Sequence, residues 1–444
     1  MHASAGGDLA ALRERPAELL QRLIRFETVN PPGGERECVG WIESLLRDAG
    51  LETRIVAADE ERPNLVARLR GRAESPPLLL QGHVDVVPVS DQNWTRPPFA
   101  GEEAGGFIWG RGALDMKGGV AMMIAAVLRA HERGLEPRGD VLLCILSDEE
   151  AGSDNGARHL VAEHAELFKG VRYALGEFGG FTLHIAGRRF APIGLSEKQV
   201  CWMRGRVHGP GGHASLPMRG GTMARLANVL RRLDRRRLPV HVTPTVRRSI
   251  EELADGLSPA LAVPLRALLV PALTDRVLDA LGKRSVIFDP ALHNTVNVTI
   301  VNGGDKVNVV PGEVELMLDG RVLPGFGADQ MLAEVAAAVG PDLELEVERF
   351  DAGGPADPDL GLWDVLAGVL RDQDPGIRPI PYLMPAVSDG RFFARLGIQP
   401  YGFTPMRLPA GFEFNSLIHS ADERIPTDAV EFGSEAMLHV LERF

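Results

Sequence analysis

The sequence predicts a three-layer α/β domain that is interrupted by a smaller inserted α+β domain. Over the first 190 residues, apolar strands alternate with amphipathic helices, which is typical of a sheet covered by helices. From residue 199 to residue 350 the strands become half-exposed, and a helical stretch punctuated by prolines occupies 245–290. After residue 351 helices and strands alternate again. We therefore expect one domain built from 1–198 and 351–444, with 199–350 inserted into it.

Each element of the larger domain follows from hydrophobic periodicity. Apolar residues spaced three and four apart indicate helices, and Gly50 and Gly134 follow two of them at positions typical of helix ends. The uninterrupted apolar run at 140–146 indicates a strand buried on both faces. The expected helices are 8–26, 35–49, 119–132 and 428–443, and the expected strands are 64–69, 77–80 and 140–146.

The inserted segment has a different pattern. Its strands alternate between apolar and polar residues, as expected for a sheet with one solvated face. Strands are expected at 199–207, 295–300, 313–318 and 343–347, and helices at 223–233 and 330–339.

Composition excludes several classes of function. Lys and Arg number 48 against 60 Asp and Glu, so the net charge is −12, which argues against nucleic-acid binding. Three cysteines are too few and too scattered for a disulfide framework or a zinc–thiolate site. The first 15 residues lack the apolar core of a signal peptide, and no apolar run is long enough to span a membrane. The sequence thus predicts a cytoplasmic protein without membrane contact.

The segments that carry chemistry follow predicted strands. His83 and Asp85 come after the apolar run at 77–80, and ligands of open α/β sheets bind at the carboxyl ends of strands. Period two places both side chains on one side, so Asp85 could orient the imidazole of His83. Glu149 and Glu150 follow the strand at 140–146, where extended neighbours would point in different directions.

Three further residues complete the set. Asp115 lies in a glycine-rich turn just before a predicted helix, Glu177 follows a short apolar segment, and His419 lies near the C-terminus. Taken singly, each has an ordinary structural explanation: a histidine at a strand end, a helix N-cap or a solvated loop charge. Together, imidazoles and carboxylates without cysteine suit zinc in a catalytic site. A carboxylate that bridges two ions would hold them about 3.5–4 Å apart, as in two-metal hydrolases.

These five segments resemble, in order, the motifs of the co-catalytic zinc hydrolases. That family includes aminoacylase, succinyl-diaminopimelate desuccinylase, glutamate carboxypeptidase and carnosinase-like dipeptidases. The resemblance spans nearly the whole chain. It implies a three-layer α/β zinc-hydrolase catalytic domain (1–198 and 351–444) with an inserted α+β lid or dimerisation domain (199–350).

The resemblance also implies roles for individual residues. His83 and Glu177 would hold one zinc, Glu150 and His419 the other, and Asp115 would bridge the two ions. Asp85 would orient His83, and Glu149 would be the general base and acid. Co²⁺ or Mn²⁺ could substitute for Zn²⁺. The family often has Asp where this chain has Glu177, and glutamate also occurs there.

The inserted segment resembles the family's lid. His213, in the segment 209–217, matches a histidine that reaches across a dimer to the oxyanion of the partner's substrate. Asn308 and Arg321 match lid residues near the substrate, and Arg391 matches an arginine near the metals. Arg321 and Arg391 could grip a substrate carboxylate, because guanidinium pairs with carboxylate through two hydrogen bonds. Ion pairing with Asp319 or Asp389 explains them equally well.

We therefore expect a homodimeric amide hydrolase that acts on a small substrate with a free carboxylate. An N-acyl amino acid amidohydrolase or a carboxypeptidase fits best, with a short peptide or an N-acyl amino acid as the substrate. A dipeptidase, an aminopeptidase or a succinyl-diamino acid desuccinylase would use the same site. An aminopeptidase also needs an acidic group for the substrate's free amine, and the sequence identifies none. A non-catalytic zinc-binding homologue would lack a ligand or the base, and all these positions are filled.

Overall fold

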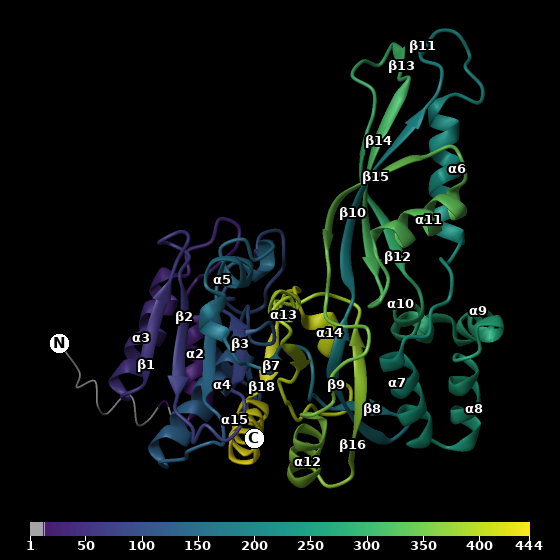
Figure 1. Ribbon diagram of the computed structural model, residues 1–444. Coiled ribbons are helices and arrows are strands. Elements are labelled where there is room, and N and C mark those ends of the chain that lie inside the picture. Colours follow the sequence, from purple (N-terminus) through teal and green to yellow (C-terminus); the bar gives the residue numbers. More distant parts are fainter. Residues whose placement is uncertain (1–11, 13) are drawn as a thin grey trace. The chain divides into compact units, whose positions relative to one another are not determined.

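The computed structural model describes residue 12 and residues 14–444 and divides into two compact units (Figure 1). Unit 1 comprises 1–195, 358–382 and 388–444, and unit 2 comprises 196–357 and 383–387. The domain boundaries at 198/199 and 350/351 stay predictions about the functional domains. The helix expected at 8–26 falls partly outside the described residues, and a described part of it is α2 (Pro16–Ile24).

A mixed sheet forms the centre of unit 1. Its strand order is β1-β2-β6-β3-β7-β17-β9-β16, and β8 pairs with β9. The central strands β6, β3 and β7 are parallel, whereas β1, β2 and β6 pair antiparallel. The strands are β1 (Glu52–Val56), β2 (Asn64–Leu69), β3 (Leu78–His83), β6 (Val141–Leu146), β7 (Tyr173–Gly176), β8 (Leu183–Ile185), β9 (Arg188–Glu197), β16 (Ile377–Met384) and β17 (Gln399–Gly402).

Helices cover both faces of this sheet, as β6 demonstrates. Val141, Leu143 and Ile145 join one buried cluster, while the alternate residues Leu142 and Cys144 join a second one. The first cluster contains residues of α2, α3 (Arg36–Asp48), α4 (Lys117–Glu132), α12 (Trp363–Gln373) and α15 (Thr427–Arg443). The second contains residues of α5 (Ala157–Glu163) and α13 (Gly390–Ala394). The predicted three-layer fold is therefore confirmed.

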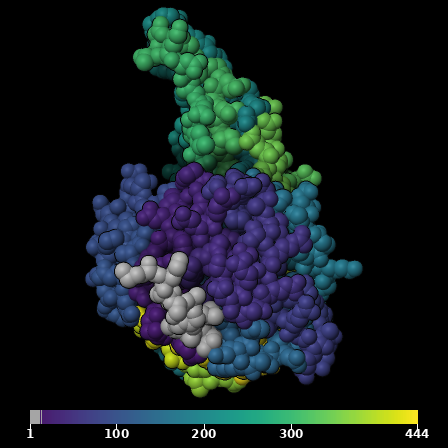
Figure 2. Space-filling view, turned by 90° about the vertical axis from the view of Figure 1, so that its left-hand side faces the viewer, coloured from purple at the N-terminus to yellow at the C-terminus, as the bar shows by residue number. Residues whose placement is uncertain are grey.

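The outer elements of unit 1 include features that the periodicity did not predict. β1 is an edge strand, and the purple surface in Figure 2 belongs to this N-terminal part of the chain. A small three-stranded sheet pairs β18 (Arg424–Pro426) with β5 (Phe107–Trp109) and β4 (Glu102–Ala104). It joins segments more than 300 residues apart, because Arg424 pairs with Trp109. Short helices η2 (Ala165–Phe168) and α14 (Phe414–Leu417) complete the unit.

Unit 2 contains a four-stranded antiparallel sheet in the order β12-β14-β10-β15. The strands are β12 (Thr295–Asn302), β14 (Glu313–Val322), β10 (Gln199–His208) and β15 (Glu344–Asp351). Alternate residues of β14, such as Leu316 and Leu318, are buried with residues of α6 (Thr222–Arg235) and α11 (Ala328–Val339). The antiparallel sheet confirms the α+β class predicted for the insertion. A two-stranded ribbon pairs β11 (Gly212–His213) with β13 (Val309–Val310).

The proline-punctuated stretch forms a separate group of helices in unit 2 (Figure 1). The helices are α7 (Pro244–Asp255), α8 (Pro259–Ala267), α9 (Pro271–Leu281), η3 (Gly282–Ile287) and α10 (Asp289–Leu292). Proline is the first residue of α7, α8 and α9, where it lacks only an N–H that the helix would leave unpaired. The prolines therefore separate the stretch into short helices.

Two further observations concern the whole described chain. Cys38, Cys144 and Cys201 are free thiols, and all three are buried. Among the helices of the described residues, none combines the length and the hydrophobicity that crossing a bilayer requires.

A buried lysine in unit 2 makes the stability of the protein depend on pH. Lys198 donates hydrogen bonds to the carbonyl oxygen of His293 at 2.8 Å and to Oγ1 of Thr295 at 3.1 Å. Burial, together with the charge of Arg321, lowers the pKa of Lys198 to about 7. Between pH 7 and the ordinary lysine pKa, the unfolded chain binds this proton and the folded chain does not. Burial of the charged Lys198 therefore lowers the free energy of unfolding by its full amount below pH 7. This loss becomes smaller as the pH rises toward 10.

We expect the substitution Lys198→Met to remove this dependence. Urea unfolding at pH 7, 8, 9 and 10 should show that the variant loses stability relative to wild type as the pH rises. The exposed Lys169→Met serves as the control and should give a constant difference from wild type. A constant difference for Lys198→Met as well would contradict the lowered pKa.

Candidate metal centre

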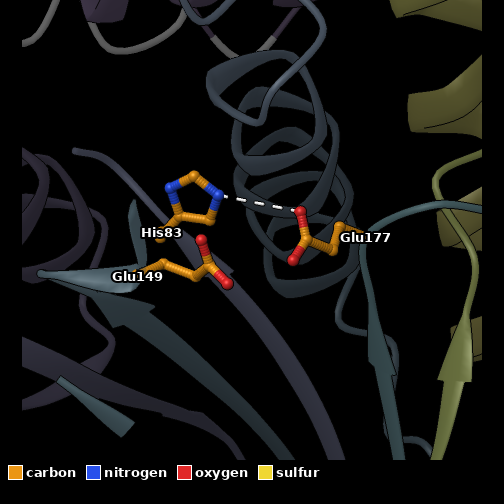
Figure 3. Close-up of side chains that lie close together, drawn as sticks. All are labelled: His83, Glu149 and Glu177. Atoms are coloured by element: carbon orange, nitrogen blue, oxygen red, sulfur yellow. Dashed lines mark ion pairs between the residues drawn. The ribbon is translucent and has the colours of Figure 1, made fainter. Parts of the chain in front are cut away.

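The carboxyl ends of three neighbouring parallel strands bring most of the predicted site residues together. His83 is the last residue of β3, Glu177 follows β7, and Glu149 and Glu150 come three and four residues after β6. Because β6, β3 and β7 are adjacent and parallel, their ends meet at one edge of the sheet. Figure 3 shows the side chains of His83, Glu149 and Glu177 converging there.

Asp115 reaches this edge because α4 packs closely over β3. A β-carbon on Gly82 would lie 2.6 Å from Cε of Met116, so a larger residue there would force the methionine side chain to shift. The helix α4 begins at Lys117, with Met116 at the N-cap position. Asp115 is therefore not the N-cap of this helix, and its carboxylate is directed to the histidines instead.

The two oxygens of Asp115 face two different histidines. Oδ1 lies 3.3 Å from Nε2 of His83, and Oδ2 lies 3.2 Å from Nε2 of His419. Nε2 of His419 is also 3.2 Å from Oε1 of Glu150, and Nε2 of His83 is 3.7 Å from Oε2 of Glu177. A carboxylate between two imidazoles, each with a further carboxylate, is the arrangement that a bridging ligand between two cations requires.

Two overlapping groups of these residues have ligand atoms close enough to share an ion. One group is His83, Glu149 and Glu177, and the other is His83, Asp115 and Glu150, with all ligand atoms of a group within 4.8 Å of one another. His83, Asp115 and Glu177 are buried, which removes the competition of bulk water for their ligand atoms. His419 is more exposed, with 48% of its side chain accessible.

The local backbone around the two glutamates differs from the prediction. Glu149 and Glu150 lie in a short 3₁₀ helix, η1 (Glu149–Ala151), so the expectation of an extended segment is wrong. Asp148 precedes it with a φ of +70°, a left-handed conformation that turns the chain sharply after β6. Both glutamates still reach the cluster, because a tight turn at the strand end keeps neighbouring side chains near the same edge.

Asp85 contacts both the histidine and the backbone of this turn. Its backbone carbonyl oxygen is 3.0 Å from Nδ1 of His83, and its carboxylate Oδ1 is 3.4 Å from the same nitrogen. The carboxylate also accepts hydrogen bonds from the backbone N–H groups of Glu149 and Glu150, both at 3.1 Å. Asp85 therefore links the orientation of His83 to the position of both glutamates.

The electrostatics of the cluster favour a bound cation. Burial and the neighbouring Glu177 raise the pKa of Glu149 well above its ordinary value, and burial raises the pKa of Glu177 to about 8. Hydrogen bonds to Asp115 and Glu150 raise the pKa of His419 to about 10. Burial lowers the pKa of His83, but hydrogen bonds to carboxylates outweigh this and raise it well above its ordinary value. These groups thus retain protons unless another positive charge compensates the carboxylates.

A polar network behind the cluster was not predicted from the sequence. Nδ2 of Asn30 donates to Oδ2 of Asp85 at 2.8 Å and to Oδ1 of Asp148 at 3.1 Å. Arg62 forms two hydrogen bonds with the fully buried Glu35, at 3.0 and 3.2 Å, and an ion pair with Asp148 at 3.0 Å. The sequence indicated only a loop around Asn30, because its partners lie 55 and 118 residues away.

We expect Glu35→Ala to destabilise unit 1 strongly. Removing one partner of a buried ion pair leaves Arg62 with only part of its compensation and costs about 3 kcal/mol. Urea unfolding should show this loss, whereas Glu37→Ala, an exposed position in the same helix, should change stability by less than about 1 kcal/mol. A loss for Glu35→Ala as small as the control's would show that Asp148 alone compensates Arg62.

Arg391 lies beside the cluster in unit 1. Its Nη1 donates to the carbonyl oxygen of Ser388 at 2.7 Å and lies 3.8 Å from Oε1 of Glu149. The adjacent Asp389 accepts a hydrogen bond from the hydroxyl of Ser153 at 2.6 Å, and burial raises its pKa to about 6. Arg391 thus brings a positive charge next to Glu149.

The other three predicted residues belong to unit 2. His213 is exposed in the ribbon of β11 and β13, and the backbone of Asn308 accepts a hydrogen bond from the N–H of Ala214 at 3.1 Å. Nδ1 of His213 lies 2.6 Å from the hydroxyl oxygen of Ser215 and accepts the backbone N–H of the same residue at 3.3 Å. Arg321 forms a double hydrogen bond with Asp319, at 2.9 and 3.0 Å. This is the ion pair that the sequence offered as the alternative to a role in substrate binding.

Comparison with known proteins identifies the family. The sequence profile of peptidase family M20/M25/M40 matches residues 79–443, which is most of the chain. The chain belongs to the M20/M25/M40 peptidase family. Family membership makes it a metal-dependent hydrolase of amide or peptide C–N bonds, which confirms the predicted family and enzyme class. The alternative of a non-catalytic homologue is therefore set aside.

Relatives in the M20 family differ in what they act on. A succinyl-diaminopimelate desuccinylase of Paracoccus denitrificans is 30% identical over 450 residues, covering 97% of this chain and 98% of that protein. The N-fatty-acyl-amino acid synthase/hydrolase PM20D1 of Bos taurus is 29% identical over 80% of this chain and 71% of that protein. The structure of the M20 metallo-carboxypeptidase Sso-CP2 from Sulfolobus solfataricus has a TM-score of 0.67 at 18% identity, covering 96% of this chain and 98% of that one.

Proposed function

We propose that this M20 peptidase is a zinc-dependent N-acyl amino acid amidohydrolase or carboxypeptidase. The observation that carries the proposal is the position of Asp115, whose two carboxylate oxygens face His83 and His419. Each histidine also lies beside a second carboxylate, that of Glu177 or Glu150. Imidazole and carboxylate donors without thiolate fit Zn²⁺, and Co²⁺ or Mn²⁺ could replace it.

The residues present fit two metal ions. His83 and Glu177 would hold one, Glu150 and His419 the other, and Asp115 would bridge them. The raised pKa values of the buried glutamates indicate that the cluster needs added positive charge. When bound, the ions would supply a Lewis acid for the amide carbonyl and acidify the attacking water.

Glu149 is the proposed general base and acid. One of its carboxylate oxygens lies within the same group of atoms as the ligand atoms of His83 and Glu177, and only 12% of its side chain is exposed. The Glu149 carboxylate would take the proton of the attacking water and return it to the leaving nitrogen. Asp85 would keep it in place through the backbone N–H of Glu149, and the charge of Arg391 favours its ionised form.

Three residues are proposed to bind the substrate. Arg391 and Arg321 would pair with its carboxylate, and Asp319 would hold the guanidinium of Arg321 in position. Asn308 would contribute amide hydrogen bonds. Because two of the three residues are arginines, we propose that the substrate has a free carboxylate.

His213 is proposed to stabilise the oxyanion from the partner subunit of a homodimer. Its Nδ1 accepts from Ser215, which leaves the Nε2–H as the donor that an oxyanion requires. A dimer interface through unit 2 is supported by β12, an edge strand on which Ile300 and Val301 are about half exposed. Light scattering of the purified protein tests the dimer directly.

The relatives support an acylated amino acid as substrate without deciding which one. Among the similar proteins, the desuccinylase and the fatty-acyl hydrolase are both named for removing an acyl group. Desuccinylation of a diamino acid and hydrolysis of dipeptides remain the alternatives, since both would use the same metal centre. The carboxypeptidase structure supports only the shared fold, because its sequence is 18% identical to this chain.

A hydrolysis panel tests the proposal. We expect cleavage of N-acyl amino acids or of peptides with a free C-terminus, and loss of cleavage when a chelator removes the metal. The panel contains N-acetyl and N-succinyl amino acids, dipeptides and aminoacyl-nitroanilides, each with and without chelator. Cleavage of only the aminoacyl-nitroanilides would contradict the substrate class, and cleavage that a chelator does not affect would contradict the metal mechanism.

A further inference from the structure

A buried ion pair outside the metal cluster has no part in the proposed function. Nη1 of Arg111 lies 2.7 Å from Oε2 of Glu423, and the two side chains are 1% and 0% exposed. Removing both charges from water is costly, so such a pair needs compensation from further hydrogen bonds. Those hydrogen bonds lead to the two segments that carry Asp115 and His419.

Glu423 holds the backbone that carries Asp115. Its Oε1 accepts the backbone N–H of Leu114 at 2.8 Å and that of Asp115 at 3.2 Å. Its other oxygen is the partner of Arg111. The pairing of β5 with β18, and a hydrogen bond from Gly110 N–H to the carbonyl oxygen of Glu423 at 2.9 Å, keep the two segments together.

Arg111 and Gln92 hold the consecutive backbone carbonyl groups of His419 and Ser420. Nη1 of Arg111 also donates to the carbonyl oxygen of Ser420 at 3.1 Å, and Nη2 donates to Oε1 of Gln92 at 2.7 Å. Nε2 of Gln92 in turn donates to the carbonyl oxygen of His419 at 2.8 Å. The indole of Trp94 covers the guanidinium of Arg111, at 5.1 Å from its ring centre.

His419 needs this support more than the other predicted ligands do. Its φ is +60°, a left-handed conformation that is unfavourable for a residue with a side chain. Its side chain is also 48% exposed, whereas that of His83 is 1% exposed. Packing therefore fixes His83, while the position of His419 depends on hydrogen bonds to its backbone.

We propose that Gln92, Arg111 and Glu423 form a brace that positions Asp115 and His419 relative to each other and sets the affinity of the metal position they share. This inference rests on the proposed function. The three residues of the brace are positioning residues, because they contact the backbone of the ligands and not the metal or the substrate. The brace does not touch His83 or Glu177, so the two metal positions depend on it unequally.

The test measures metal binding directly. Metal-stripped wild type and variants are titrated with Zn²⁺ in competition with a chromophoric chelator, which reports the affinity of each equivalent. Gln92→Ala removes the donor to His419 at a half-exposed position and spares the ion pair. We expect it to weaken one zinc equivalent 10–100-fold and the other less than threefold, with an unchanged melting temperature. Asn93→Ala, exposed in the same loop, is the matched control and should bind like wild type.

Two further variants separate positioning from folding. Gln92→Glu keeps an acceptor for Arg111 but loses the donor to His419, and it should weaken the same equivalent as Gln92→Ala. Glu423→Gln loses the charge that holds the backbone of Asp115, and because Asp115 faces both histidines, this variant should weaken both equivalents. In the two Gln92 variants, equal weakening of both equivalents, or affinities like those of wild type, would overturn the brace while leaving the proposed function intact. A wild-type chain that binds no zinc would overturn the proposed function and the brace with it.

Discussion

We expect Glu149→Gln to reduce hydrolysis by on the order of 10²–10⁴-fold and to leave two metal ions per chain. The amide keeps the size of the glutamate side chain but cannot take a proton from water, and general acid–base catalysis contributes about this factor. The proposed ligands are unchanged, so metal content measured by plasma mass spectrometry should equal that of wild type. The backbone N–H of residue 149 can still donate to Asp85, which keeps the turn in place.

The same experiment distinguishes the base from a ligand. The atoms of Glu149 lie within one possible ion-binding group together with His83 and Glu177. If Glu149 were a ligand, Glu149→Gln would lose one metal ion together with activity. Glu163→Gln, an exposed glutamate on α5, is the control and should retain both activity and metal. Retained activity in Glu149→Gln would show that another group is the base.

We expect Asp115→Asn to abolish measurable hydrolysis and to lower the metal content from two ions to one or none. Each carboxylate oxygen of Asp115 faces a different histidine, at 3.3 and 3.2 Å, and the amide replaces one of them by an NH₂ group that cannot bind a cation. The loss of one negative charge between two cations further weakens both positions.

The stability of this variant provides a second readout. Asp115 is buried among charged groups, and its pKa is lowered because hydrogen bonds to His419 and His83 outweigh the effect of burial. Without metal, Asp115→Asn should therefore be less stable than wild type at pH 7, because both histidines lose a carboxylate partner. Asp48→Asn, exposed at the end of α3, should leave stability and metal content unchanged. Two tightly bound ions in Asp115→Asn would contradict the bridging role.

Most of the site could be predicted because its residues follow strands whose hydrophobic pattern is unambiguous. The continuous apolar run of β6 indicated burial on both faces, and the structure buries its alternate residues in two separate clusters. His83, Glu149 and Glu177 then came together because parallel strands end at one edge. In each case the strand that positions the side chain can be recognised from about ten residues of sequence around it.

The supporting residues could not be predicted in this way. Asn30, Arg62 and Glu423 act on segments far away in the chain, and polar side chains in loops have no periodicity. The short antiparallel pairing of β5 and β18 joins residues 315 to 319 positions apart, and neither three-residue strand has a recognisable pattern. β1 was missed because most of its residues are exposed. The 3₁₀ turn at Glu149 was missed because hydrogen bonds from its backbone to Asp85, 64 residues away, help to form it.

The central claim is that the cluster around Asp115 binds two metal ions that hydrolysis requires. The most direct measurement is the rate of N-acyl amino acid hydrolysis during titration of the metal-stripped protein with Zn²⁺. The account predicts no activity at the start and a rise that saturates at two equivalents per chain. Full activity in the stripped protein, or zinc binding no tighter than that of Asp115→Asn, would contradict it.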